Sequence, residues 1–155
     1  MECVPGPRWK EDKEIMVLKV KPDDFEAIQS ERKRWEARPL VEHRKGGGRG
    51  NPFAPWKYLH LATEGRGVKV QRYYERGLSS VDPSAAALFL RIAAVRLYEP
   101  TECSSIPPEQ AMVMELGTDL LPDVADASAR VQVYRDIYGA DRCALGIVAM
   151  RLVRT

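Results

Sequence analysis

Residues 30–38, SERKRWEAR, crowd charged side chains around one tryptophan, where a half-buried strand usually carries aliphatic residues. A lysine near a carboxylate, such as Lys33 near Glu36, can offer a cation to a phosphate or to a developing oxyanion, and a desolvated lysine amine can act as a base. The carboxylate can hold Lys33 and Arg38 in position or accept hydrogen bonds from the amine and N–H groups of a nucleobase. The alternative is a ladder of ion pairs on a solvated strand, which contributes little to stability. The residue types alone fit both interpretations.

This charged segment is predicted to form a strand over residues 33–40, which Pro39 ends or confines to the edge of a sheet. Because side chains alternate along a strand, we expect Glu36 and Arg38 side by side on one face and Lys33 on the other.

The rest of the chain predicts an α+β fold. Its apolar periodicity, prolines and glycines place the expected elements as follows: a strand over 14–20, a short helix from Pro22, strands over 57–63 and 67–75 with a turn at 64–67, a strand in the later part of 86–99, helices over Glu109–Leu116 and Asp126–Tyr138 ending at Gly117 and Gly139, and a last strand over 145–153. Five or six strands and about three helices in this order suit a small mixed barrel or curled sheet with the helices packed at its openings.

The length of 155 residues fits one domain, and we expect it over residues 14–155, with residues 1–13 as an N-terminal extension. No run of about 18 apolar residues and no apolar core of a signal peptide appears in the sequence. We therefore expect an intracellular protein, cytoplasmic and monomeric by default, that does not span a membrane.

The cysteines and histidines do not form a metal-binding pattern. Cys3, Cys103 and Cys143 are odd in number and far apart, which fits neither a disulfide framework nor a zinc cluster. His43 and His60 have no ligand-like spacing to one another or to a cysteine. We expect free thiols, no metal and no cofactor.

Positive charge is concentrated in the middle of the chain. Residues 32–76 carry twelve Lys and Arg against four Asp and Glu, a net charge of +8, whereas residues 1–31 (five against eight) and 77–155 (seven against ten) each have a net charge of −3. Aromatic residues are interspersed in the basic segment, a combination that suits pairing with phosphates and stacking on bases. A solubilising face over a core of aromatics is the alternative. Residues 43–56, rich in glycine and proline, are predicted to be a long loop, either one that wraps a phosphate backbone or a flexible connection.

Residues 20–38, VKPDDFEAIQSERKRWEAR, resemble the opening motif of the ASCH domains, a branch of the PUA-like superfamily, whose signature is G-x-K-x-x-E-x-R after a short helix. Residues 115–123, 129–139 and 145–153 are similar to the family's closing helix and last strand, so the resemblance spans about residues 14–153. Glu31 replaces the motif's glycine. A left-handed backbone there would cost a non-glycine residue roughly 1 kcal/mol, and the added acid would disfavour a nearby anionic ligand.

The resemblance implies a PUA-like β-barrel with a cleft where Lys33, Glu36 and Arg38 converge, in a family associated with RNA binding. On this basis the first functional hypothesis is that the domain binds RNA or a nucleotide. Lys33 and Arg38 would contact phosphate or carbonyl groups, and the basic segment would contact flanking RNA. The candidate contacts in that segment are Arg44, Lys45, Arg49, Trp56, Lys57 and Arg72.

The second hypothesis is a small hydrolase, because some ASCH members are amidohydrolases of acetylated nucleosides or ribonucleases. The resemblance then implies Lys33 and Asp123 as an acid/base pair, with Glu36 as a third candidate catalytic residue. Glu36 stands where the amidohydrolase members have a threonine, so this chain departs from their pattern.

Overall fold

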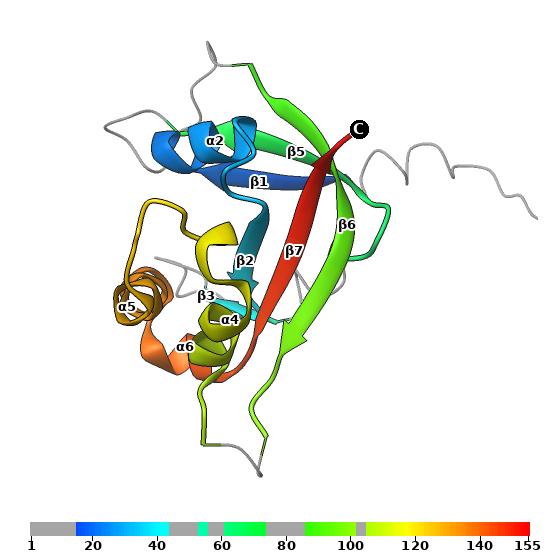
Figure 1. Cartoon of the computed structure of the whole chain (residues 1–155). Helices are drawn as coiled ribbons and strands as arrows, with labels where there is room; N and C mark the ends of the chain where they lie inside the picture. Colours follow the sequence, from blue (N-terminus) through cyan, green and yellow to red (C-terminus); the bar gives the residue numbers. More distant parts are fainter. Residues whose placement is uncertain (1–14, 44–52, 56–60, 74–85, 102–104) are drawn as a thin grey trace, which may run out of the picture.

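A mixed five-stranded sheet, strongly curled, forms the centre of the molecule (Figure 1). The computed structural model describes residues 15–43, 53–55, 61–73, 86–101 and 105–155. The strands lie in the order β1 (Met16–Val20), β5 (Gly67–Arg72), β6 (Leu88–Tyr98), β7 (Ile147–Arg154) and β2 (Trp35–Pro39). β1 and β5 are parallel, and all other neighbouring pairs are antiparallel. The predicted α+β fold around a curled mixed sheet is therefore confirmed. The sheet forms a half-barrel, and its edge strands are β1 and β2.

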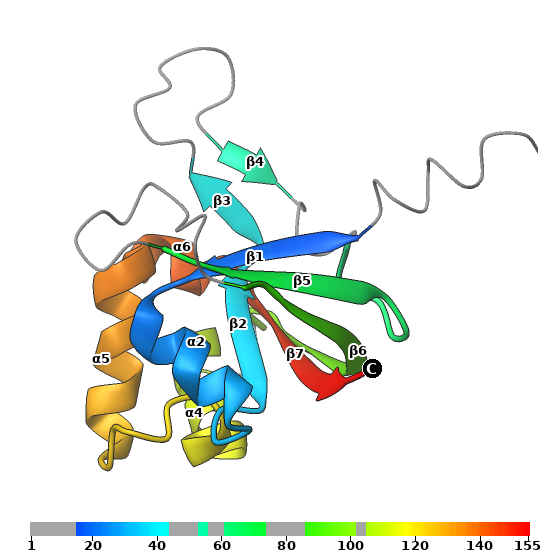
Figure 2. The same ribbon diagram turned by 90° about the horizontal axis from the view of Figure 1, so that it is seen from above.

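Helices cover both faces of this sheet (Figures 1 and 2). Helix α2 (Pro22–Gln29) connects the two edge strands, and Pro22 occupies its first turn. The other helices are α4 (Pro108–Leu116), the short 3-10 helix η1 (Gly117–Asp119), α5 (Ala127–Tyr138) and α6 (Ala140–Ala144). The predicted helices over 109–116 and 126–138 are confirmed; Asp126 is the N-cap of α5, and its carboxylate accepts a hydrogen bond of 3.1 Å from the N–H of Ala129. None of the helices in the described part of the chain has the length and apolar character needed to cross a bilayer.

Two hydrophobic cores lie on opposite faces of the sheet. On the inner face, Phe25 and Ile28 of α2 pack with side chains of β1, β5, β6 and β7. On the outer face, α4, α5 and α6 pack on β2 and β7. Strand β7 contributes to both cores, Val148 and Met150 to the first and Ile147 to the second. This burial on both faces explains why its sequence is a nearly continuous apolar run rather than an alternating one.

Several predicted elements differ from the structure. The strand expected over 57–63 is wrong in its described part, because Leu61 is helical and neither Ala62 nor Thr63 is in a strand. The loop expected over 43–56 is wrong at its ends, where β3 (Val41–His43) pairs with β4 (Phe53–Pro55) in a separate ribbon, which projects from the sheet (Figure 2). Helix α6 was not predicted. Elements of three to five residues are too short for apolar periodicity to distinguish helix, strand and loop.

The packing around Gly146 leaves no room for a side chain. It has φ of 126°, and a Cβ atom there would lie 2.6 Å from Cδ1 of the buried Leu40. We predict that Gly146→Ala lowers the free energy of unfolding by about 3 kcal/mol, because backbone strain and overpacking act together. Urea denaturation measures the change.

The matched control is Gly65→Ala, where φ is 90° and the added Cβ would meet no atom within 4 Å. Strain alone should cost about 1 kcal/mol there. Equal losses in the two variants would contradict a role for the close approach to Leu40.

Candidate functional site

The segment between α2 and β2 brings Lys33 to the same side as Glu36. Glu31 adopts the left-handed conformation expected for the glycine position of the motif, with φ of 65°. The chain turns there, and the N–H groups of Arg32 and Lys33 both donate to the carbonyl of Ala27, at 2.9 and 3.0 Å. Because β2 begins only at Trp35, strand alternation does not extend back to Lys33. The expectation that Lys33 and Glu36 lie on opposite faces is therefore wrong.

A buried ion-pair network centred on Glu36 joins the three motif residues. The Lys33 ammonium lies 3.3 Å from Oε1 of Glu36, and Nε and Nη2 of Arg38 lie 3.0 and 2.9 Å from Oε2. Lys33 also donates to the carbonyl of Leu120 at 2.5 Å. The side chains of Lys33, Glu36 and Arg38 are 3%, 9% and 14% exposed. Both carboxylate oxygens are thus engaged, and Arg38 is the member most accessible to solvent.

Arg38 also connects the two edges of the half-barrel. Its Nη2 donates to the carbonyl of Lys19 in β1 at 3.2 Å, while its own backbone lies in β2. The network therefore bridges β1 and β2 through side chains at the point where the sheet stays open.

The cations determine the charge state of Glu36. Burial alone would raise the pKa of its carboxyl, but Lys33 and Arg38 outweigh burial and hold the pKa below its usual value of 4.5. The carboxylate is consequently ionised at neutral pH and available as a hydrogen-bond acceptor.

Two further polar residues lie within electrostatic range of the network. Burial raises the pKa of the Asp24 carboxyl on α2, with Lys33 opposing the shift and Glu36 adding to it. Burial also raises the pKa of Tyr134 on α5 well above 10, with Glu36 and Asp24 contributing. The Tyr134 hydroxyl is buried and has no hydrogen-bond partner among the described residues. Neither residue was among the site candidates predicted from the sequence.

Asp123 and Lys33 take part in separate interactions. Asp123 pairs with Arg32 at 2.6 Å on the surface, and its side chain is 65% exposed. Arg32 also pairs with Glu26 at 3.0 Å. Within the described part of the chain, no ion pair or hydrogen bond joins Lys33 to Asp123.

The other sequence candidates are only partly described. Arg72 is half-buried at the end of β5. Arg44, Lys45, Arg49, Trp56 and Lys57 lie outside the described residues, as do Cys3 and Cys103. Cys143 is a buried free thiol, and no group of three or more His, Cys, Asp or Glu in the described ranges could hold a metal.

We predict that Glu36→Gln lowers the free energy of unfolding at pH 7 by about 3 kcal/mol, because it leaves the buried charges of Lys33 and Arg38 without their counter-charge. The stabilisation by ionised Glu36 is complete above its unfolded-state pKa, near 4.5, and is lost as pH falls through the lower folded-state pKa. The difference in the free energy of unfolding between wild type and variant should therefore become smaller below pH 4.5. Urea denaturation across this pH range measures it.

Glu26→Gln is the control, since Glu26 also pairs with an arginine but its side chain is 72% exposed. It should change stability by about 0.5 kcal/mol or less. A Glu36→Gln variant as stable as this control at pH 7 would contradict the assigned role of the buried carboxylate.

Neither a protein-family model nor a curated protein matches this sequence. Solved structures do match its fold. Hypothetical protein PH0355 aligns with a TM-score of 0.57 and 17% identity over 88% of this chain and 95% of its own. Protein PF0455 from Pyrococcus furiosus aligns with a TM-score of 0.53 and 17% identity over 88% of this chain and 94% of its own.

A mutant of the ASCH protein from Zymomonas mobilis also aligns, with a TM-score of 0.50 and 15% identity over 92% of this chain and 69% of its own. The likeness is one of fold, and it agrees with the motif resemblance in residues 20–38. The chain therefore has an α+β fold similar to that of the Zymomonas mobilis ASCH protein.

Proposed function

We propose that this ASCH-fold domain binds single-stranded RNA or a nucleotide at the Glu36-centred network. The observation that carries the proposal is the buried carboxylate held between Lys33 and Arg38. Buried ion pairs of this kind are often no more stabilising than apolar residues of the same volume, because desolvation offsets the attraction. Their presence at the open seam of the half-barrel therefore favours a role in recognition.

The chemistry of the network suits a nucleobase. The ionised Glu36 can accept hydrogen bonds from an exocyclic amine or a ring N–H, and Arg38 can donate to a carbonyl or a phosphate. The Tyr134 hydroxyl, without a partner among the described residues, would gain one from an acceptor on the ligand. Glu36 and Arg38 come from β2 and Tyr134 from α5, so a bound ligand would contact both elements.

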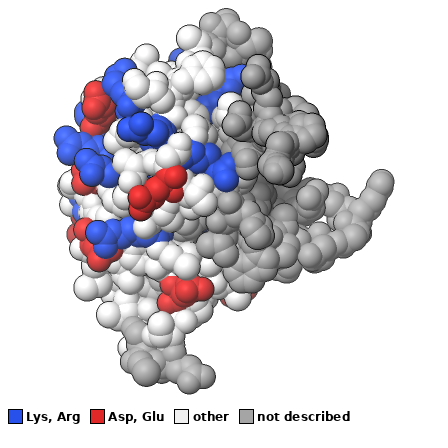
Figure 3. Space-filling model, turned by 90° about the vertical axis from the view of Figure 1, so that its right-hand side faces the viewer, with Lys and Arg blue, Asp and Glu red and all other residues white. Residues whose placement is uncertain are grey.

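The outer face of the sheet also suits RNA. Phe89 on β6 is 62% exposed, and the Lys69 ammonium on β5 lies 6.0 Å from its ring centroid. Arg91 and Arg151 are exposed on β6 and β7. Figure 3 shows basic side chains gathered over the upper part of one side of the molecule, with acidic side chains between and below them. An exposed aromatic ring among cations is a typical feature of surfaces that bind single strands.

The hydrolase alternative has no observation in its favour. Lys33 is bonded to Glu36 and Leu120, and Asp123 to Arg32, so an acid/base pair of Lys33 and Asp123 would require rearrangement. It stays a hypothesis, and the binding experiment tests it when the ligands are examined for cleavage.

We predict that a fluorescently labelled 12-nucleotide single-stranded RNA binds the wild type with an affinity that weakens as salt increases, because protein cations displace counterions. Arg38→Gln should weaken binding about tenfold or more, through the loss of charge-assisted hydrogen bonds. Fluorescence anisotropy measures the affinity, and circular dichroism verifies that each variant is folded.

Arg96→Gln is the matched control. It also removes one arginine, but one that is 51% exposed and paired with Glu115 at 3.3 Å. Equal affinities for wild type, Arg38→Gln and Arg96→Gln would contradict the proposal. Shortened or deacylated ligands, detected by mass spectrometry with wild type but not with Lys33→Met, would replace it with the hydrolase.

A further inference from the structure

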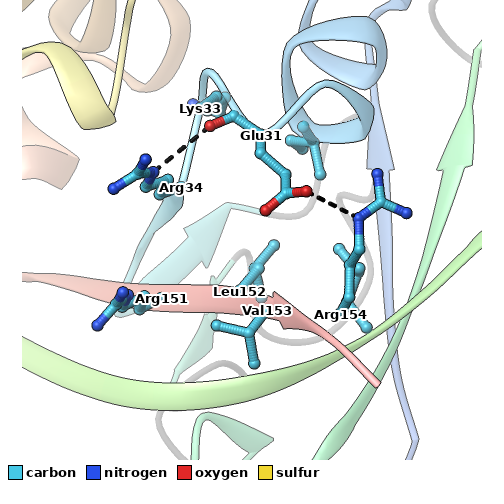
Figure 4. Close-up of a pocket in the computed structure, with 9 residues that line it drawn as sticks. Glu31, Lys33, Arg34, Arg151, Leu152, Val153 and Arg154 are labelled. Atoms are coloured by element: carbon cyan, nitrogen blue, oxygen red, sulfur yellow. Dashed lines mark hydrogen bonds and ion pairs between the residues drawn. The ribbon is translucent and has the colours of Figure 1, made fainter.

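A pocket of about 290 Å³ lies between the 31–34 segment and the end of β7 (Figure 4). Its apolar lining comes from Ile28, Leu90, Leu152 and Val153, and its charged lining from four basic residues and a single acid, Glu31. One of the basic residues is Lys33, whose ammonium is engaged by Glu36 and Leu120. The cations that the pocket can offer to a ligand are therefore arginines.

Two of these arginines are available for a ligand. Arg34 and Arg151 are exposed and lie at the same side of the pocket, with Glu31 in the middle and Arg154 at the other side (Figure 4). Within the described residues, the Arg151 side chain makes no hydrogen bond or ion pair, and the Arg34 side chain makes only a contact of 3.5 Å from Nε to the carbonyl of Glu31.

The backbone fixes Arg34 in place. Its N–H donates to the carbonyl of Asp119 and its carbonyl accepts from Leu152, both at 2.9 Å. Arg151 is equally constrained, since it lies within β7 and pairs in register with Trp35 of β2. The two guanidinium groups are thus attached to rigid elements. Groups positioned in this way are better suited to bind a small anion than cations on mobile segments.

Glu31 neutralises the third arginine. Its carboxylate lies 3.0 Å from Nε of Arg154, while Nη2 of Arg154 donates to the carbonyl of Gln29 at 2.6 Å. Glu31 is also the one non-glycine residue with a positive φ in the described part of the chain. A strained residue thus places a negative charge in an otherwise basic pocket, a pattern associated with functional sites.

We propose that this pocket is a phosphate-binding subsite, with Arg34 and Arg151 as its contacts and Glu31 as the group that limits its affinity. Planar guanidinium groups match the oxygens of a phosphate, to which they can donate paired hydrogen bonds. A bound phosphate would compete with the Glu31 carboxylate for Arg154 and would be repelled by it. The inference depends on the proposed function only for the source of the phosphate, an RNA strand or a free nucleotide.

The first test uses inorganic phosphate alone, so that it does not depend on RNA binding. Titration of the full chain is followed through the Nε–Hε signals of the arginines by NMR. We expect saturable shifts for Arg34, Arg151 and Arg154 and none for Arg96. Glu31→Gln should bind phosphate about tenfold more tightly, because a nearby like charge is removed.

Two more variants separate charge from strain and from loss of fold. Glu31→Gly removes the same charge and also relieves the left-handed backbone, and it should bind as tightly as Glu31→Gln. Arg151→Gln, at an exposed position where folding should be preserved, should abolish the saturable shifts. Shifts that are absent in both wild type and Glu31→Gln, or that persist in Arg151→Gln, would overturn the proposal.

The second test identifies the source of the phosphate and separates this inference from the proposed function. Nucleoside monophosphates are compared with nucleosides, and 5′-phosphorylated with 5′-hydroxyl RNA, in wild type, Arg151→Gln and Arg38→Gln. Loss of the preference for phosphate in Arg151→Gln, with nucleosides still bound, supports the subsite. A preference that is lost only in Arg38→Gln overturns the subsite and leaves the proposed function standing. Phosphate binding without any RNA or nucleoside binding overturns the proposed function and leaves the subsite.

Discussion

The carboxylate of Glu36, held between Lys33 and Arg38, is the interaction on which the arrangement of this domain depends. The sheet does not close into a barrel, and no backbone ladder joins its edge strands β1 and β2. Arg38 spans the opening by donating to the carbonyl of Lys19, and Glu36 fixes the Arg38 side chain. A buried charge is tolerated only when it is paired and hydrogen-bonded. The bridge between β1 and β2 therefore depends on the ionisation of Glu36, and the ionisation of Glu36 depends on its two cationic partners.

The same constraint links stability to ligand recognition. Groups that are fixed before a ligand arrives lose little conformational entropy on binding, and Lys33, Glu36 and Arg38 are already fixed by one another. Asp24 on α2 and Tyr134 on α5 lie within electrostatic range of this network. Glu31, a few residues earlier in the chain, lines the proposed phosphate pocket, so the short segment between α2 and β2 contributes to both sites. A ligand with a base and a phosphate would find complementary chemistry on either side of this segment.

The sequence predicted most reliably where long apolar patterns or caps are present. The apolar run of β7 and the ends of α4 and α5 at Gly117 and Gly139 are confirmed. The motif identified Lys33, Glu36 and Arg38, which the structure joins. It did not reveal on which side Lys33 lies, because that depends on β2 beginning at Trp35 rather than at Lys33. Asp24 and Tyr134 were missed because their role arises from tertiary burial, and Leu61 and β4 because short segments carry too little periodicity.

The most direct test of RNA recognition at the Glu36-centred network is photocrosslinking of the full chain to a single-stranded RNA that carries 4-thiouridine, followed by mass spectrometry of the digested protein. The account predicts crosslinked peptides from residues 21–38, which contain α2, the connecting segment and most of β2. Arg38→Gln should reduce their yield, whereas Arg96→Gln should not. Crosslinks confined to α4 and α6 would contradict the account.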